Sequence, residues 1–229
     1  TLIQKGEAFF NVSGQLYPIN SPYAGLYAYA SPYRSMCGDS SINNVVPLTG
    51  VYLNGTYVNV GTSGLQKINW EDGTVYFNNT IPSNVTVSGR YSVKEVNTQI
   101  SNQWELKLLF ENKYVSNSKF NQVLSGLPLD VKTIPAIFLR YKDTENKPFA
   151  FGGIDDNSIK IRAIVIADSE IMKIGICNIL KNLNLSGVPF VTGGLPFDFR
   201  GSYTGLPYNY NTLPFDTTYT PFIKEVRAY

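Results

Sequence analysis

The sequence predicts a mainly β or α+β protein, in which an antiparallel, hairpin-rich sheet carries one core helix between extended N- and C-terminal arms. The prediction depends on dipeptides typical of tight hairpin turns, on one run with helical spacing, and on proline-rich ends. The chain has 229 residues, of which 43% are hydrophobic, enough for one sizeable core. We expect an extended N-terminal arm at 1–48, a β-rich core at 49–186 and a Pro/aromatic extension at 187–229.

The first segment is predicted to be extended because proline interrupts it repeatedly, at Pro18, Pro22 and Pro32. A proline restricts the residue before it to extended conformations and cannot donate to a central sheet ladder. Each tyrosine here offers a large apolar face with a polar tip, a combination that suits contact surfaces. Packing against a neighbouring subunit and packing against the chain's own domain both remain open. The candidates for intersubunit contact are Tyr17, Tyr23, Tyr27 and Tyr33.

Two tight hairpins are predicted after this arm. Residues typical of strands flank Asn54-Gly55 and, further on, Asp72-Gly73. Asn-Gly and Asp-Gly readily adopt the two positive φ angles of a type I′ turn, whose twist matches that of the paired strands. Residues 85–96 continue the β-branched, alternating pattern, with Gly89 as a candidate bulge.

The segment 104–114 fits two patterns. Ser101 can cap a helix that gathers apolar residues on one side, whereas alternate residues of the same segment are apolar as in a strand. We favour the helix. The apolar residues concerned are Trp104, Leu106, Leu108, Leu109 and Phe110.

Two strands and one helix follow. Residues 134–141 resemble a buried strand with proline near its start, and residues 159–167 alternate at first and are then continuously apolar. This second pattern indicates that one face is covered along the strand and both faces are covered at its end. Asp168-Ser169 is a candidate N-cap for the core helix near 169–182. Its apolar residues recur at three- and four-residue spacing: Met172, Ile176, Ile179, Leu180 and Leu183.

The C-terminal extension is predicted to be ordered coil that lies over its own sheet or over a neighbour. Proline precedes an aromatic residue repeatedly between residues 189 and 222, which excludes a helix. The aromatic rings have too much apolar area to remain in water. The last residues, Phe222–Tyr229, are expected to close as a final strand. The candidates for intersubunit contact are Phe197, Phe199, Tyr208, Tyr210 and Phe215.

The composition excludes most enzyme chemistries. The chain has no histidine, the commonest general base and metal ligand. Its two cysteines, Cys37 and Cys177, are too few for a tetrahedral zinc site and are expected to be free thiols. A glycosidase with paired carboxylates needs no histidine, but nothing in the sequence selects the pair. We therefore expect no enzyme activity, no catalytic residues, no cofactor and no metal.

Charge and hydropathy point to no partner among nucleic acids or membranes. Lys+Arg number 19 against 17 Asp+Glu, and the net charge of +2 is far below the basic excess of a nucleic-acid binder. No run reaches the roughly 18 consecutive apolar residues that a membrane helix needs. We expect neither specific nucleic-acid binding nor membrane binding.

Short segments in the central half of the chain, residues 50–185, carry a resemblance: Val87–Asn97, Leu108–Tyr114, Ile134–Phe138 and Asn146–Gly153. They resemble the virion structural proteins of tailed bacteriophages, especially those of marine and other environmental phages. The likeness lies in the general character of the sequence and in these short segments, and it includes no catalytic motif. It implies a non-enzymatic component of the particle, in the neck or tail, arranged as a ring of identical copies. The resemblance assigns no role to any individual residue.

The expected function is that of a structural subunit of a bacteriophage particle that assembles through its arms. Rings arise when head-to-tail contacts close on themselves, so the expected partners are copies of itself in a ring and other virion proteins. The expected location is the virion, assembled in the host cytoplasm. The alternative is a carbohydrate- or receptor-binding β-module on a viral or cell surface, whose exposed aromatic rings stack on sugars.

Overall fold

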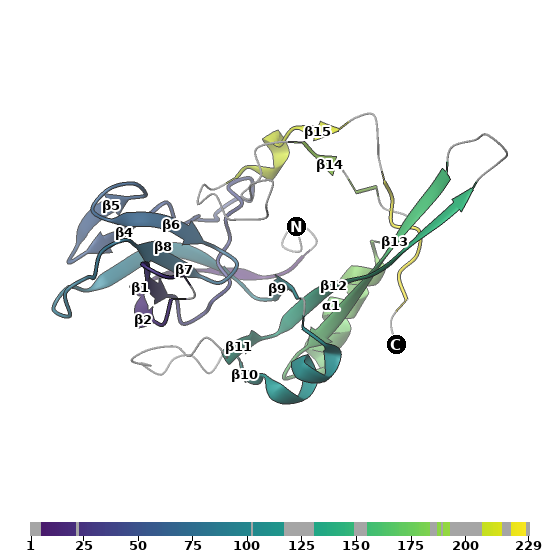
Figure 1. Cartoon of the computed structure of the whole chain (residues 1–229), viewed down its shortest axis with the longest axis horizontal. Coiled ribbons are helices and arrows are strands. Elements are labelled where there is room, and N and C mark those ends of the chain that lie inside the picture. Colours follow the sequence, from purple (N-terminus) through teal and green to yellow (C-terminus); the bar gives the residue numbers. More distant parts are fainter. Residues whose placement is uncertain are drawn as a thin grey trace.

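The computed structural model describes residues 6–21, 23–101, 103–116, 131–148, 155–183, 187–188, 190–192, 208–216 and 221–227. These residues form a mainly β fold with antiparallel sheets and one α-helix, so the predicted fold class is confirmed. The molecule has two lobes (Figure 1). We call residues 6–96 the sandwich lobe and residues 97–183 the hairpin lobe.

The sandwich lobe consists of two four-stranded antiparallel sheets. The first has the strand order β1 (Phe9–Gln15), β8 (Val87–Lys94), β4 (Gly50–Leu53) and β5 (Thr56–Asn59). The second has the order β2 (Tyr17–Ile19), β3 (Tyr27–Ala30), β7 (Thr74–Phe77) and β6 (Leu65–Asn69). Side chains from both sheets meet in one buried core, because alternate residues of a strand point to the same side. Its members include Val51, Ile68, Trp70, Val75, Phe77, Tyr91 and Val93.

The N-terminal segment differs from the predicted arm. β1 pairs with β8 along its whole length, and β3 lies between β2 and β7. Between β1 and β2 the chain crosses from one sheet to the other at Leu16, which is buried and whose backbone N–H donates to Val87 O at 2.8 Å. Pro18 is tolerated because β2 is an edge strand. The described residues of this segment thus belong to the sandwich, while the wider division of the chain into arm, core and extension stays a prediction.

The hairpin at Asn54-Gly55 is formed as expected. β4 and β5 pair across this dipeptide, and the φ angles of Asn54 and Gly55 are 48° and 86°. Both positive angles fit a type I′ turn, so this prediction is confirmed. Gly89, by contrast, is not a bulge, since it pairs in register with Gly14 in β1.

The second hairpin is present with a longer loop than predicted. β6 and β7 are joined by residues 70–73, of which Gly73 alone has a positive φ. The side chain of Asn69 accepts the backbone N–H groups of Glu71 and Asp72 and so shapes the loop. A two-residue turn is excluded because Trp70 turns inward and is buried in the sandwich core.

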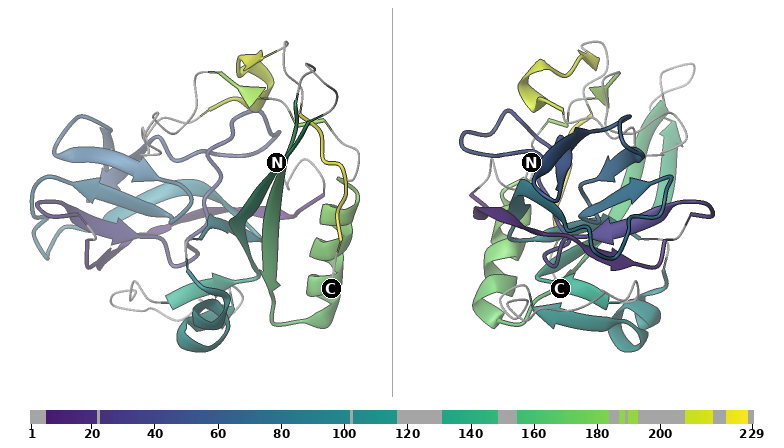
Figure 2. Two further views of the ribbon diagram at one scale, coloured as in Figure 1. Left: turned by 45° about the vertical axis from the view of Figure 1, so that its right-hand side comes forward. Right: turned by 90° about the vertical axis from the view of Figure 1, so that its left-hand side faces the viewer.

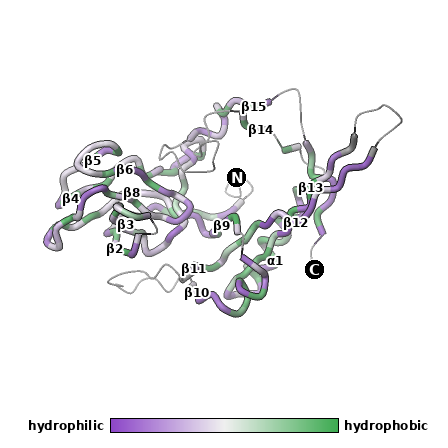
Figure 3. The backbone as a smooth tube through the Cα atoms, in the orientation of Figure 1, coloured by the Kyte–Doolittle hydropathy of each residue, from purple (hydrophilic) through white to green (hydrophobic). Residues whose placement is uncertain are grey.

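The hairpin lobe is built on a three-stranded sheet with the order β13 (Asp155–Ile166), β12 (Ala136–Pro148) and β9 (Asn97–Ile100). The helix α1 (Glu170–Lys181) covers one face, where Ile176 clusters with Ile137. A π-helical turn (Lys107–Glu111), with the parallel pair β10 (Lys113–Ser116) and β11 (Val131–Ile134), covers the opposite face, where Leu108 clusters with Phe138. Figure 2 shows these layers on either side of the long hairpin, and Figure 3 shows hydrophobic stretches along them.

The sequence made predictions for two helical segments of this lobe, the core helix near 169–182 and segment 104–114. The core helix is confirmed, and the Ser169 side chain caps it by accepting the backbone N–H of Met172. In segment 104–114 the favoured helix is present as a π-helical turn, whereas the alternative of a strand through the alternating residues Trp104 to Phe110 is wrong, because β10 begins only at Lys113. The helix stops where pairing of β10 with β11 takes over the backbone hydrogen bonds.

The β12–β13 hairpin extends beyond its cover. Residues 136–139 of β12 are buried or half-buried, whereas residues 141–147 and 157–161 are mostly exposed. The exposed part is a two-stranded ribbon, which projects from the lobe (Figure 1). A two-stranded ribbon alone is marginally stable in water, so the outer hairpin depends on its covered base or on a further contact.

Short pairings hold the described C-terminal residues. β14 (Phe190–Val191) pairs with β15 (Phe215–Asp216), and a 3-10 turn spans Tyr210–Thr212. The predicted final strand at 222–229 is wrong for its described residues, which form an isolated bridge from Phe222 to Gly187 and no ladder. Pro221 at its start has no N–H to donate, and its carbonyl accepts one hydrogen bond, from Val188 N at 2.7 Å.

We expect Leu16→Ala to lower the free energy of unfolding by about 2–5 kcal/mol, the usual cost of truncating a buried leucine. Leu16 is 1% exposed, so the substitution leaves a cavity where the chain crosses between the sheets. Chemical denaturation followed by circular dichroism measures the change. The matched control is Leu106→Ala, at a position 70% exposed, which should change stability by less than about 0.5 kcal/mol. A separable N-terminal arm would instead give equally small effects for both variants.

Candidate interaction surfaces

The N-terminal candidate tyrosines lie on the sandwich lobe. Tyr33 packs on its core, and Tyr17 is half-buried in β2. Tyr23 and Tyr27 are exposed, and the ammonium of Lys67 lies 4.1 Å from the centroid of the Tyr23 ring. These contacts within the chain do not test a role between subunits, which stays a prediction for all four tyrosines.

The C-terminal candidates fall into two groups. Phe197 and Phe199 lie outside the described residues. Tyr208, Tyr210 and Phe215 belong to a segment that we call the strap, residues 208–216. Within it, the rings of Tyr210 and Phe215 pack edge-on with centroids 5.7 Å apart.

The strap is anchored to the sandwich lobe next to Asp39. The backbone N–H of Tyr208 donates to Gly38 O at 3.0 Å, and Tyr208 O accepts the N–H of Ser40 at 2.8 Å. The carboxylate of Asp39 accepts the backbone N–H of Tyr210 at 3.1 Å. Chain segments about 170 residues apart in sequence are thereby joined. The described part of the extension therefore packs on its own chain at this point, one of the two possibilities left open by the sequence.

Burial determines the electrostatics of this anchor. Asp39 is completely buried, and its second carboxylate oxygen has no hydrogen-bond partner among the described residues. Burial raises the pKa of the Tyr208 phenol, and the neighbouring acidic groups of Asp39, Cys37 and Glu71 raise it further. Tyr208 therefore stays neutral and adds no negative charge beside Asp39.

Large apolar side chains are exposed in the π-helical turn and in the residues just before it. Leu108 faces the sheet and is buried, whereas Trp104 and Phe110 are 74% and 78% exposed. Leu106 and Leu109 are exposed as well. We call this surface the helical-turn patch: Trp104, Leu106, Leu109 and Phe110.

Two arginines hold this patch in a defined orientation. The guanidinium of Arg140 lies 5.1 Å from the centroid of the Trp104 ring. Glu105 forms a bidentate pair with Arg162, with both contacts at 2.8 Å. Because Arg140 and Arg162 come from β12 and β13, the patch is fixed to the sheet that it covers. Side chains held in this way lose little conformational entropy on binding.

A second apolar surface lies on the opposite face of the sheet, beyond the cover of α1. Leu139 still packs with α1, but Tyr141, the next β12 residue on that side, is exposed and pairs with Ile161 in β13. Ile100 in β9 pairs with Leu139 and extends the surface sideways. We call Ile100, Tyr141, Ile159 and Ile161 the sheet patch; these residues are 60–79% exposed.

Neither patch was singled out by the sequence analysis, although each left a signal. In residues 104–110, large apolar residues are more numerous than one face of a helix or strand can bury. In β13, the alternation of Ile159 and Ile161 indicates a covered face. Both patterns indicate more apolar surface than the local element can bury. They do not indicate whether this surface is covered by the same chain or by another one.

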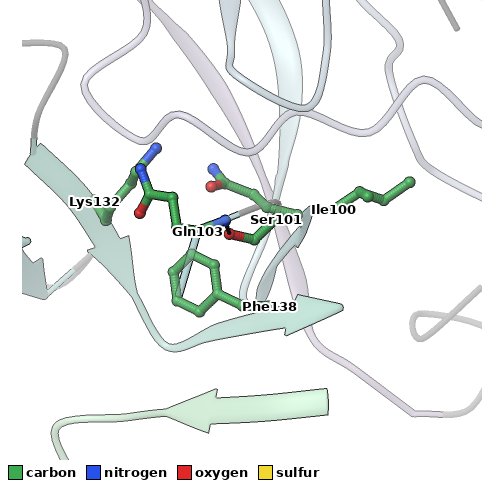
Figure 4. A pocket seen from close by; sticks show the side chains of 6 residues that line it. Ile100, Ser101, Gln103, Lys132 and Phe138 are labelled. Carbon is green, nitrogen blue, oxygen red and sulfur yellow. Dashed lines mark hydrogen bonds between the residues drawn. The ribbon is translucent and has the colours of Figure 1, made fainter. Parts of the chain in front are cut away.

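A small pocket of about 180 Å³ lies beside the end of β9 (Figure 4). Its lining includes Gln103, Ser101 and Lys132, with Phe138 beneath them, while Ile100 extends away from the other side chains. The Ser101 hydroxyl accepts the backbone N–H of Gln103. The lining contains neutral amides, a hydroxyl and one ammonium group, and no carboxylate that could accept a proton from a substrate.

Other reactive groups are dispersed. Cys37 is buried in the sandwich lobe and Cys177 is half-buried on α1, and both are free thiols, as the sequence predicts. Among the described residues no group of three or more side chains is arranged to bind a metal ion.

A buried carboxyl group lies where the two lobes join. Glu7 accepts the backbone N–H of Val96 at 2.5 Å, and its other oxygen has no partner among the described residues. Val96 in turn clusters with Ile137 and Ile176 of the hairpin lobe. Burial raises the pKa of Glu7 from 4.5 to about 7, against smaller opposing effects of the Val96 hydrogen bond and of Lys94. The junction therefore contains a group that titrates near neutral pH.

Comparison with known proteins gives no relative: no family model, no curated protein and no solved structure matches this chain. No helix in the described part of the chain has the length and apolar character needed to cross a membrane.

We expect the free energy of unfolding to fall as the pH rises from about 4.5 to 7, by up to about 3 kcal/mol from Glu7. In this window the unfolded chain has lost the Glu7 proton that the folded chain still holds, so raising the pH favours unfolding. Glu7→Gln should remove this part of the slope and be more stable than the wild type at pH 8. Urea denaturation between pH 4 and 8 measures the free energy of unfolding of both proteins at each pH.

The control for this experiment is Glu111→Gln, at an exposed position on the π-helical turn, which should keep the wild-type pH profile. Superimposable profiles for Glu7→Gln and the wild type would contradict the raised pKa of Glu7.

We expect Asp39→Ala to release the strap, because the substitution removes the acceptor for Tyr210 N. Chymotrypsin, which cleaves after aromatic residues, should then cut within residues 208–216 several-fold faster than in the wild type, since cleavage requires local opening. Asp39→Asn keeps an acceptor oxygen and should give a smaller increase. Thermal melts establish that both variants are folded at the digestion temperature. An unchanged cleavage rate in Asp39→Ala would rule out Asp39 as the anchor.

Proposed function

We propose that this chain is a non-enzymatic structural subunit that assembles with copies of itself, as a component of a bacteriophage neck or tail ring. The observation that carries the proposal is the exposure of large apolar side chains on the hairpin lobe, in the helical-turn patch and the sheet patch. Large exposed apolar patches mark protein–protein interaction sites.

The packing beneath the patches supports this interpretation. Leu108 and Phe138 are fully buried directly under the helical-turn patch, and Ile137 and Ile176 are buried next to the sheet patch. The exposed residues therefore surround well-formed clusters and are surplus to the core of their own lobe. A subunit that buries these exposed side chains against a neighbour is stabilised by the removal of their apolar surface from water.

The kind of assembly follows from the resemblance of Val87–Asn97 and the later segments to virion proteins of tailed bacteriophages. Members of a ring need a rigid body and contacts that repeat from one copy to the next. The hairpin lobe supplies such contacts in addition to the terminal segments from which we first expected them. Tyr23 and Tyr27, which stay exposed on the sandwich lobe, remain candidates for further contacts.

The alternative, a carbohydrate- or receptor-binding module, is favoured by one observation on the sandwich lobe. Tyr57 is exposed on the edge strand β5, and its ring lies 5.1 Å from that of Tyr52. Exposed rings held by neighbours present flat faces on which sugars can stack. A module of this kind would bind its ligand as a monomer.

We expect the purified chain to form closed oligomers, with a mass that increases stepwise with concentration in size-exclusion chromatography with light scattering. Negative-stain electron microscopy should then show rings of uniform diameter. A glycan array provides the comparison, because sugar binding by a chain that stays monomeric at all concentrations would favour the alternative. A chain that remains monomeric and binds no glycan contradicts both.

A further inference from the structure

The two apolar patches belong to the same lobe but face in opposite directions. Leu108, beneath the helical-turn patch, clusters with Phe138 and Ile164. Ile137 and Val165, next to the sheet patch, cluster with α1 on the other face. The sheet separates these clusters, as the alternation of side chains along β12 and β13 requires. One copy therefore cannot cover either patch with the other, whereas two copies can.

The two patches are similar in area. From the exposed fractions of their side chains, and about 150–250 Å² for a large side chain, each patch offers roughly 500 Å² of apolar surface. If all of this surface were covered, the contact would bury at most roughly 1,000 Å², which reaches the lower limit for a specific interface.

The sequence pattern of β13 independently indicates that the sheet patch is covered. Ile159 and Ile161 alternate with Lys160 and Arg162, as in a strand with one buried face. In the structure Ile161 is nevertheless 68% exposed. Among the described residues α1 is the cover of this sheet face, and it reaches the cluster around Val165. No described element covers the outer part of this face, although its sequence pattern is that of a strand with one covered face.

Two charged groups beside the helical-turn patch already have partners within the chain. Glu105 is already paired with Arg162, and Arg140 lies over the Trp104 ring. On the sheet patch, the neighbours on the same side, Thr144 and Ala163, are uncharged. Burying a paired charge costs less than burying a single one, so Glu105 and Arg162 oppose this contact less than two unpaired charges would.

From the opposite orientation, the matched areas and the uncovered strand face, we propose that the helical-turn patch of one copy packs on the sheet patch of the next copy. The occupant of each patch is thus a second copy of this chain. The proposal rests on the function proposed above and names the contact that would build the assembly. Because the contact joins two different surfaces, it is head-to-tail, and repetition produces a ring where the rotation closes.

Two glutamate substitutions test the contact from its two sides. Ile161→Glu places a charge in the sheet patch and Leu106→Glu places one in the helical-turn patch, at positions 68% and 70% exposed. Each should weaken self-association at least about tenfold, as expected for an anchor residue in an interface. Far-UV circular dichroism and thermal melts should match the wild type, because neither side chain is part of a buried cluster. Sedimentation velocity measures the association.

The matched control is Ile171→Glu. Ile171 lies on the outer side of α1, is 84% exposed and belongs to neither patch. The same change of isoleucine to glutamate should leave association unchanged there. Weakening by Ile171→Glu to the same extent as by Ile161→Glu would overturn the proposal, because added charge alone would then account for the effect.

Mixing the two variants gives the decisive result. An Ile161→Glu copy keeps its helical-turn patch, and a Leu106→Glu copy keeps its sheet patch, so an equimolar mixture should form 1:1 heterodimers and nothing larger. Association of the variants as strong as that of the wild type, or a mixture that contains monomers alone, would overturn this contact while the wild type still assembles. A wild-type chain that stays monomeric at every concentration would overturn the proposed function itself, and this contact with it.

Discussion

The architecture depends on the burial of one short stretch of backbone on both of its faces. Ala136, Ile137 and Phe138 at the start of β12 are almost completely inaccessible, with α1 on one side and the π-helical turn on the other. A strand covered on both faces cannot shift its register by one residue without exchanging the two sets of side chains. This stretch therefore fixes which way α1 and the helical turn face, and with them the directions of the two exposed patches.

The same stretch connects the lobes. β9 pairs with the start of β12 and continues directly from the end of β8 in the sandwich, so the two sheets are linked by a few residues around Val96. Glu7 is part of this link, since it binds Val96 N from the N-terminal segment. Burial raises the pKa of this carboxyl group to about 7, because desolvation outweighs the hydrogen bond from Val96 N–H.

The terminal segments have partners within the chain. The sequence analysis placed the expected contacts between subunits in extended terminal segments, but the described part of the N-terminal segment belongs to the sandwich and the strap is bound to Asp39. Large apolar side chains are also exposed on the folded hairpin lobe, where Arg140 contacts Trp104 and Arg162 pairs with Glu105. Contacts between rigid surfaces lose less entropy on association than contacts made by ordering an arm.

Elements with local signals could be predicted from the sequence alone: the Asn54-Gly55 turn, the Ser169 cap, the helix that follows it and the mainly β class. These depend on backbone preferences and spacing within a few residues. Tertiary packing sets the pairing of the N-terminal strands, the longer loop at Trp70, and which of Trp104, Leu108 and Phe110 is buried. Those outcomes depend on partners far away in the sequence. The hydrophobic effect has no preferred direction. A sequence pattern therefore indicates that a side chain favours burial, whereas the fold shows which neighbours bury it.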